Sequence, residues 1–213
     1  MQDREEQTVQ RIIEAAGVII ARDGYTGAAT PEIQRLAQVS RDGFYHHFDS
    51  KEQVGDAILA HQNTYFQQVA EQTASGPVPQ FWLQALIDIS HHYTAGLLED
   101  PVLRAAVRLS IEPGPYQTAE SYAGPLGAVT AVLESARAAG ELQDHVEPVE
   151  ASRTIVGCYS GVQMLSLALA ERDGLHQQVS AMWALTMPGL ARPAVLSRLR
   201  LGAPRPTGAA RPR

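Results

Sequence analysis

Two short helical segments, at residues 30–37 and 40–47, are joined by a turn of only two residues, and this spacing constrains the fold more than any other feature of the chain. A turn of that length holds two helices against each other at a fixed angle. A longer helical pattern at residues 7–23 precedes them and is stopped by Gly24. Three helices in about 45 residues, the last two joined by a tight turn, form a helix-turn-helix arrangement.

Capping residues mark the starts of these two helices. Thr30 is expected to cap the first, because Pro31 and Glu32 follow it at positions that favour the first helical turn. Gln38-Val39 forms the turn, and Ser40 is expected to cap the second helix. The apolar side chains that lock the pair together are expected to be Ile33, Ala37, Val39, Phe44 and Phe48.

Helical patterns continue through the rest of the chain, and no convincing strand is present. We expect a short helix at 102–110 and long ones at residues 49–72, 80–98, 121–139, 149–171 and 175–187. The chain is therefore expected to be all-α. It should have a small N-terminal domain at residues 1–50, a larger helical domain at 51–201 and a disordered tail at 202–213, which is rich in Gly, Pro, Ala and Arg.

Charge does not provide a general attraction to nucleic acid. The formal net charge is −6, and the first 60 residues carry six Lys/Arg against ten Asp/Glu. Any DNA contact must therefore rely on a few well-placed cations and on backbone N–H groups. The single cysteine excludes an internal disulfide, and the longest apolar stretch, residues 155–170, is shorter than a membrane span of about 20 residues. No signal peptide is recognised, so a cytoplasmic protein is expected.

The second short helix has a polar face once its apolar residues turn inward. A hydroxyl, a guanidinium and an imidazole beside a glycine that permits close approach are suited to the major groove of DNA. The pattern alone is weak support, because few short amphipathic helix pairs bind DNA. The residues expected on this face are Ser40, Arg41, Asp42, Gly43, Tyr45 and His46.

The stretch from Thr30 to Val54, TPEIQRLAQVSRDGFYHHFDSKEQV, closely resembles the signature of the tetracycline-repressor (TetR) family. The pairs Val39-Ser40, Phe44-Tyr45, His47-Phe48 and Lys51-Glu52 stand at the spacing of that signature. Two positions depart from it, since Gln38 and Asp42 stand where the family usually has glycine. The resemblance implies a dimeric transcriptional repressor in which the helix after the turn reads DNA and a larger helical domain binds a small molecule.

The resemblance also implies roles for individual residues. Thr30, Tyr45 and Lys51 would contact phosphates, and His47 would be structural. Base edges or the groove floor would be contacted by Ser40, Arg41, Gly43 and His46. No cofactor, metal or membrane is expected.

Three further segments, Asp100–Leu109, Asp56–Gln62 and Leu142–Val146, resemble γ-butyrolactone-type autoregulator receptors. Those receptors bind butyrolactones, butenolides or furans and control antibiotic biosynthesis genes. An apolar cavity with a few polar groups would suit such a ligand. The polar candidates are Gln62, Tyr93, Tyr122, Tyr159 and Gln163, and the apolar candidates, each of which could equally be ordinary core, are Trp82, Leu86, Ile89, Leu109 and Leu126.

The last two long helices carry more apolar residues than one core requires, and in the family such helices pair with a second copy. The residues expected to supply this surface are Val156, Val162, Leu165, Leu169, Met182, Leu185 and Leu190.

Other functions remain open at this stage. A TetR-family repressor of an efflux or metabolic operon could respond to a drug or an acyl compound, and a DNA-binding protein could act without a ligand. The spacing of Asp88, His91, His92 and Asp100 would permit a metal site in an enzyme.

Overall fold

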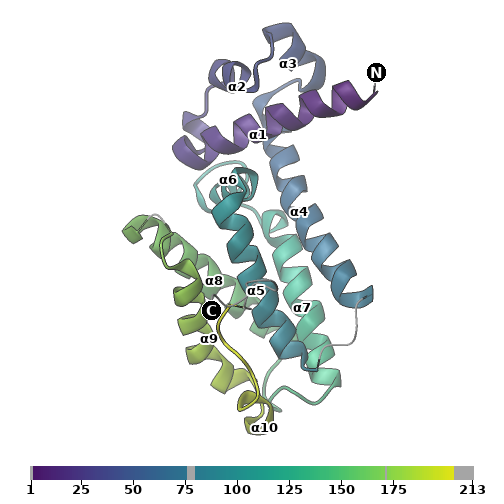
Figure 1. Ribbon diagram of the computed structural model, residues 1–213, viewed down its shortest axis with the longest axis vertical. Helices are drawn as coiled ribbons and strands as arrows, with labels where there is room; N and C mark the ends of the chain where they lie inside the picture. The colour runs from purple at the N-terminus through teal and green to yellow at the C-terminus, as the bar shows by residue number, and fades with distance from the viewer. Residues whose placement is uncertain (1, 76–79, 171, 204–213) are drawn as a thin grey trace, which may run out of the picture. The chain divides into compact units, whose positions relative to one another are not determined.

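The computed structural model describes residues 2–75, 80–170 and 172–203, which form helices joined by turns and loops (Figure 1). The helices are α1 (Gln2–Gly27), α2 (Thr30–Ala37), α3 (Arg41–His47), α4 (Lys51–Ser75), α5 (Trp82–Glu99), α6 (Pro101–Ile111), α7 (Ala123–Ala138), α8 (Pro148–Ala170), α9 (Leu175–Leu190) and α10 (Pro193–Leu196), with a 3-10 turn at Glu120–Tyr122. Among these residues the only β pairing is an isolated bridge between Leu142 and Ala191. The expected all-α class is confirmed. No helix in the described ranges is long and apolar enough to cross a membrane.

The helices pack into two compact units. Unit 1 comprises the described parts of Met1–Ala70 and Gly96–Pro125, and unit 2 those of Glu71–Ala95 and Leu126–Arg213. Unit 1 therefore contains α6 together with the three N-terminal helices. The functional boundary expected at residue 50 stays a prediction.

The core of unit 1 is built around α1. Ile12 and Ile20 are fully buried on α1, and Phe44 of α3 and Val102 of α6 belong to the same apolar cluster. Helix α1 approaches α6 closely at Gly17, where an added Cβ would lie only 3.0 Å from the Cα of Val102. The packing therefore requires a residue without a side chain at this point of α1.

The helix-turn-helix has the expected boundaries, with one correction. The N-cap of α2 is Ala29, in an extended conformation, and Thr30 is the first helical residue rather than the cap. Thr30 and Pro31 are the first two residues of the helix, and no side-chain hydrogen bond caps α2. Ser40 caps α3 as predicted, since its Oγ accepts a hydrogen bond from the N–H of Gly43 at 3.0 Å.

Two backbone positions in this region adopt left-handed φ values. Helix α1 is interrupted at Gly24, with a φ of 77°, which is where the sequence predicted its end. Gln38 ends α2 at φ 56°, ψ 44°, and its N–H bonds to the carbonyl of Arg35. A non-glycine residue is uncommon in this conformation. The turn therefore tolerates the glutamine that replaces the family's usual glycine.

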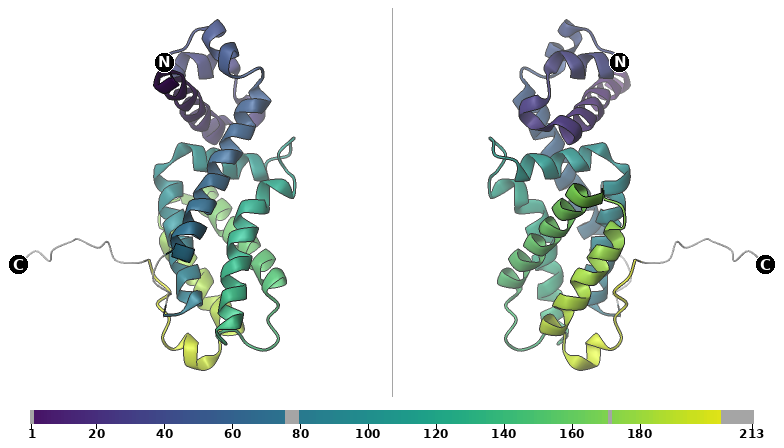
Figure 2. Two further views of the ribbon diagram at one scale, coloured as in Figure 1. Left: turned by 90° about the vertical axis from the view of Figure 1, so that its right-hand side faces the viewer. Right: turned by 90° about the vertical axis from the view of Figure 1, so that its left-hand side faces the viewer.

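The core of unit 2 surrounds Trp183 of α9, which is fully buried. Its indole Nε1 donates to the Oγ of Ser90 on α5 at 2.8 Å. The buried carboxylate of Glu141 caps the start of α5, accepting from the backbone N–H groups of Trp82 and Leu83 at 2.8 and 2.9 Å. Helices α8 and α9 lie side by side in this unit (Figure 2).

The long helices after α3 are confirmed, with end points within three residues of those predicted, whereas α1 begins at Gln2, five residues before its predicted start. Helix α9 continues to Leu190, past Pro188, and the short α10 was not expected. Residues 204–213, which make up most of the tail predicted to be disordered, lie outside the described residues.

Candidate nucleic-acid interface and effector residues

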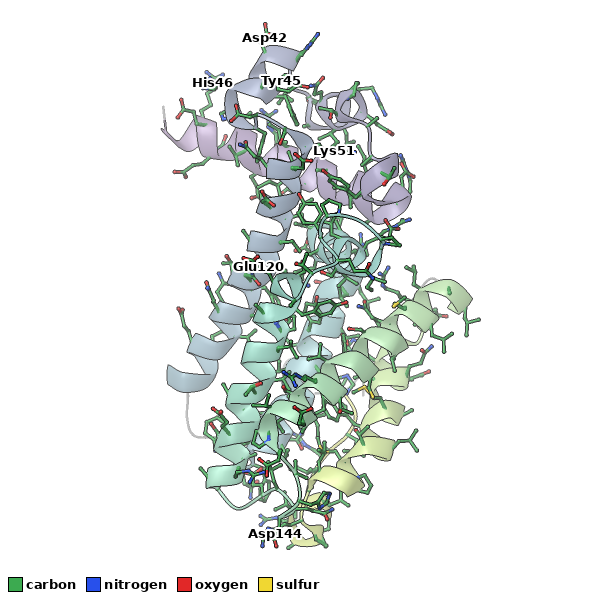
Figure 3. All side chains as sticks on the ribbon, turned by 180° about the vertical axis from the view of Figure 1, so that it is seen from behind. Asp42, Tyr45, His46, Lys51, Glu120 and Asp144 are labelled. Atoms are coloured by element: carbon green, nitrogen blue, oxygen red, sulfur yellow. The ribbon has the colours of Figure 1, made fainter. Side chains whose placement is uncertain are left out.

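The polar face predicted for α3 is exposed. Arg41, Asp42, Tyr45 and His46 all face solvent from this helix, and Figure 3 shows the labelled Asp42, Tyr45 and His46 at the same end of unit 1. Phe44, on the opposite face, is completely buried in the unit 1 core. The helix therefore presents its polar side chains from a rigidly packed base, as a reading helix must.

Contacts within α3 orient its polar groups. The guanidinium of Arg41 lies over the ring of Tyr45, 5.9 Å from its centre, and the rings of His46 and His47 meet edge to face at 4.9 Å. His47 is half-buried, in keeping with the structural role expected for it. Both Arg41 and Tyr45 remain exposed to solvent.

Lys51 has a structural role that the sequence did not reveal. Its Nζ donates to the carbonyls of Tyr25 and Ala28, at 2.8 and 3.0 Å, and lies 4.5 Å from the centre of the Tyr25 ring. The ammonium thus satisfies backbone carbonyls at the end of α1. Since an ammonium has three protons, one donor remains for the predicted phosphate contact.

Local ion pairs neutralise part of the acidic charge of this region. The guanidinium of Arg22 bonds to the carboxylates of Asp23 and Glu32, the latter at 2.9 Å, and Arg35 lies 3.8 Å from Glu32. Accordingly the pKa of Arg22 is raised and that of Asp23 is lowered, mainly by their mutual hydrogen bonds.

Thr30, which the sequence predicted to contact a phosphate, is half-buried at the first turn of α2.

Two anchors join α6 and the loop after it to the N-terminal helices, and no sequence pattern indicated either one. Arg108 of α6 donates to the backbone carbonyls of Ala21 and Arg22 near the end of α1 and is paired with Glu112. The hydroxyl of Tyr116 donates to the carbonyl of Glu52 at 2.6 Å. Both anchors lie inside unit 1: Arg108 joins α6 to α1, and Tyr116 joins the loop after α6 to α4.

The residues predicted to bind an effector are distributed between the two units. In unit 1, Gln62 is buried, Leu109 belongs to the core formed with α1, and Tyr122 is half-buried. The Oη of Tyr122 lies 3.4 Å from the carbonyl of Ser110, and burial raises its pKa. Unit 2 contains the other seven: Trp82, Leu86, Ile89, Tyr93, Leu126, Tyr159 and Gln163.

Unit 2 contains a set of polar side chains between α5 and α8. The hydroxyl of Thr94 donates to the carbonyl of Ser90 and lies 2.8 Å from the Oη of Tyr159, which is therefore the donor to Thr94. The rings of Tyr93 and Tyr159 are 5.8 Å apart. The predicted residues Tyr93 and Tyr159 are thus brought together.

Gln163 lies one turn beyond Tyr159 on α8 and is 3% exposed. Its Oε1 is buried without a hydrogen-bond partner among the described residues, and so is the Oγ of Ser166, which is fully buried. Buried polar atoms are usually satisfied, so these two oxygens mark a place where a bound molecule or water would be stabilised.

The metal site considered from the sequence does not assemble. Asp100 caps α6 and bonds to His61 at 2.7 Å, whereas the His91 side chain pairs with His176. Asp88 accepts from Gln84. Across the described ranges, no group of three or more His, Cys, Asp or Glu side chains could hold a metal ion.

The outward face of α8 and α9 differs in part from the predicted apolar surface. Leu165, Leu169 and Leu185 are 58%, 73% and 83% exposed, as expected. Met182 is buried, and Val162 and Leu190 pack against the unit 2 core. The exposed face additionally includes Met164, Leu167 and two glycines, Gly157 and Gly161, at which an added Cβ would meet no described atom within 4 Å.

Replacing Lys51 with alanine should lower the free energy of unfolding by about 2 kcal/mol, because two carbonyls at the end of α1 lose a charged donor. Tyr45→Phe is the matched control, since Tyr45 is an exposed residue of the same region and should leave stability unchanged within about 0.5 kcal/mol. Urea unfolding measures both. Equal stability of Lys51→Ala and wild type would show that the capping bonds contribute nothing.

Comparison with known proteins agrees with this architecture. Residues 8–58 match the family described as bacterial regulatory proteins, tetR family. Over 199 residues the chain is 31% identical to the A-factor receptor protein of Streptomyces griseus, covering 93% of this chain and 69% of that protein. It is similar in structure to full-length tylp, a TetR regulator from Streptomyces fradiae, with 30% identity, a TM-score of 0.77 and coverage of 92% and 93% of the two chains. CprB from Streptomyces coelicolor, solved in complex with its biological operator sequence, has 25% identity, a TM-score of 0.75 and coverage of 92% and 94%. The chain belongs to the tetR family of bacterial regulatory proteins.

Proposed function

We propose that the protein is a transcriptional repressor that binds a pseudo-palindromic operator as a homodimer and is released by a small signalling molecule of the butyrolactone, butenolide or furan type. The genes under its control would be those of antibiotic biosynthesis. The observation that carries the proposal is the exposed polar face of α3, held on a fully buried Phe44 and oriented by the Ser40 cap.

Sequence reading is assigned to the residues of α3 that face solvent. Arg41 can donate two hydrogen bonds to a guanine edge, and His46 and the Ser40 hydroxyl can reach neighbouring groups. Tyr45, Lys51 and Thr30 supply donors for phosphates, and Gly43 permits close approach. Contacts of both kinds together explain how a chain of net charge −6 can bind DNA through a local surface.

A second copy of the chain is the proposed occupant of the outward face of α8 and α9. Several large apolar side chains of these two helices are exposed, among them Leu165, Leu169 and Leu185, and a gathering of exposed apolar groups is typical of a protein–protein contact surface. Gly157 and Gly161, one turn apart on α8, would allow a partner helix to approach closely. A two-fold dimer would present two α3 helices to two operator half-sites.

The effector is assigned to the interior that contains the polar set of α5 and α8. Similarity to the A-factor receptor protein and the three segments that resemble butyrolactone receptors support a ligand of that class. Such ligands are mainly apolar with a lactone and a hydroxyl. The unpartnered Oε1 of Gln163 would accept a hydrogen bond from that hydroxyl, and the Tyr93–Tyr159 pair would contact the ring.

Effector binding must change the DNA-reading helices to cause release. The anchors of Arg108 and Tyr116 make α6 part of the same packed unit as α1 and α3. An effector that binds better when α6 has shifted would therefore favour a reading-head arrangement that no longer fits the operator.

Operator selection tests the DNA-reading surface. Arg41→Ala should relax base preference at the position it contacts, at a cost of about 1–3 kcal/mol for the preferred base. Tyr45→Phe should instead weaken binding to all sequences by a similar factor, because phosphate contacts carry no base information. Fluorescence anisotropy on selected and scrambled duplexes separates the two. An unchanged preference profile in Arg41→Ala would place another residue at the base edge.

The dimer surface is tested by Leu185→Asp. A carboxylate buried in both halves of a symmetric interface should convert the dimer to monomers and abolish operator binding. Leu98→Asp, at an exposed leucine of unit 1, is the control and should remain dimeric. Sedimentation velocity gives the result. If the Leu185→Asp variant still sediments as a dimer, the interface lies elsewhere on the chain.

The effector class is tested by mobility shift with A-factor and a panel of butenolides and furans. Wild type should release the operator, whereas Gln163→Leu should hold it at ligand concentrations at least tenfold higher, with unchanged DNA affinity. Release by a hydrophobic drug or acyl compound, and by no member of the panel, would instead favour a repressor of an efflux or metabolic operon.

A further inference from the structure

Two oxygens on α8 are buried without a hydrogen-bond partner among the described residues, and the proposed function uses only one of them. They are the Oε1 of Gln163, a residue that is 3% exposed, and the Oγ of Ser166, which is fully buried. The backbone carbonyl of Ser166 accepts from the N–H of Arg172 at 3.1 Å, so the hydroxyl is the group left over. A buried hydroxyl of this kind needs an explanation, since most are bonded.

The hydroxyl of Ser166 differs from those of other residues on the same helix. A serine or threonine in a helix commonly donates its hydroxyl proton to a backbone carbonyl of the preceding turn. Ser152 and Thr154 of α8 both do so, at 2.7 and 3.1 Å. The hydroxyl of Ser166 makes no such bond. Its proton is therefore available to a ligand.

The polar groups that precede these two oxygens between α5 and α8 are satisfied within the protein. Tyr159, one turn before Gln163, donates to the hydroxyl of Thr94, and Thr94 donates to the backbone carbonyl of Ser90. The unpartnered oxygens are thus an exception in an otherwise bonded interior. A buried polar atom without a partner lowers stability, and such costs are typical of functional sites, where a ligand supplies the partner.

The two oxygens belong to one face of α8. Ile155, Tyr159, Gln163 and Ser166 follow one another at intervals of three or four residues, and the first two pack in the unit 2 core. Side chains at this spacing are neighbours on a helix, with Cβ atoms about 5–6 Å apart. One small ligand group lying over this turn of α8 can therefore contact both oxygens.

The chemistry of the two oxygens selects the ligand group. The amide oxygen of Gln163 only accepts, so an atom that bonds to it must carry a proton, whereas the hydroxyl of Ser166 can donate to a lone pair. A ligand hydroxyl satisfies both, and it reproduces the bonds that a water molecule would make there. A ketone can accept from Ser166, but it has no proton for Gln163.

We propose that Gln163 and Ser166 form a two-point site for a hydroxyl group of the effector, in which the ligand hydroxyl donates to Gln163 and accepts from Ser166. The inference rests on the proposed function, because it takes this interior of unit 2 as the effector site. It adds Ser166 as a ligand contact and assigns a specificity. An effector with a hydroxyl at this position binds more tightly than one with a ketone, which leaves the oxygen of Gln163 unpaired.

Two probes with the same carbon skeleton, 2-hexanol and 2-hexanone, test the site without using a lactone. Saturation-transfer NMR titrations with the full-length protein give both dissociation constants. Wild type should bind 2-hexanol about tenfold more tightly than 2-hexanone, since a buried acceptor left without a donor costs at least the equivalent of a several-fold loss of affinity.

Three variants separate the roles of the two residues. Gln163→Leu removes the acceptor, so it should bind the two probes with similar affinity. Ser166→Ala removes a donor that both probes use, so it should weaken both by a similar factor, roughly fivefold, and keep the preference for 2-hexanol. Ser160→Ala, at a half-buried serine of the same helix, is the control and should bind both probes as wild type does.

The site is overturned if wild type does not bind 2-hexanol, or binds the two probes equally. It is also overturned if Gln163→Leu retains the preference, or if Ser166→Ala binds both probes as tightly as wild type. Failure of the effector class gives a different result: no lactone, butenolide or furan releases the operator, while the preference for 2-hexanol and its loss in Gln163→Leu persist.

Discussion

The packing of α6 against α1 is the interaction on which the arrangement of the N-terminal helices depends. Gly17 lets the two helices approach to the point where a Cβ would touch the backbone of Val102. On its other side α1 supports α2 and α3 through buried residues such as Ile12 and Phe44. Arg108 adds a polar clamp at the end of α1. The proposed function requires a shift of α6 to reach α3 through these packed side chains, which resist small independent movements.

An acidic chain can bind DNA when its charges are arranged locally. Glu32 and Asp23 are paired with Arg22, so their charges are partly neutralised within the protein. Arg41 is exposed on α3, whereas Lys51 bonds to two backbone carbonyls at the end of α1 and lies over the Tyr25 ring. This distribution of charges supports DNA recognition by a few oriented groups rather than by a strong positive field.

The helices and the exposed face of α3 could be predicted from the sequence because they depend on local patterns of caps and apolar spacing. Which apolar residues of α8 and α9 face outward could not be predicted, since both helices are apolar on several sides. In the structure Met182 is buried in the same core as Trp183, whereas Leu185 is exposed. The second role of Lys51 and the clamp of Arg108 depend on residues 23 to 87 positions away, which no local pattern encodes. The sequence singled out Gln163 as a polar residue on an apolar stretch, and the structure shows that it is buried; its contact with an effector stays a prediction.

The central claim is that one protein binds an operator and an effector in mutually opposing states. Calorimetric titration of A-factor, or of the panel member that causes release, into the free protein and into the protein–operator complex tests it most directly. Linkage requires the operator to weaken effector binding by the same factor by which the effector weakens operator binding, roughly 5- to 150-fold. Effector affinity that is the same with and without bound operator would contradict the account.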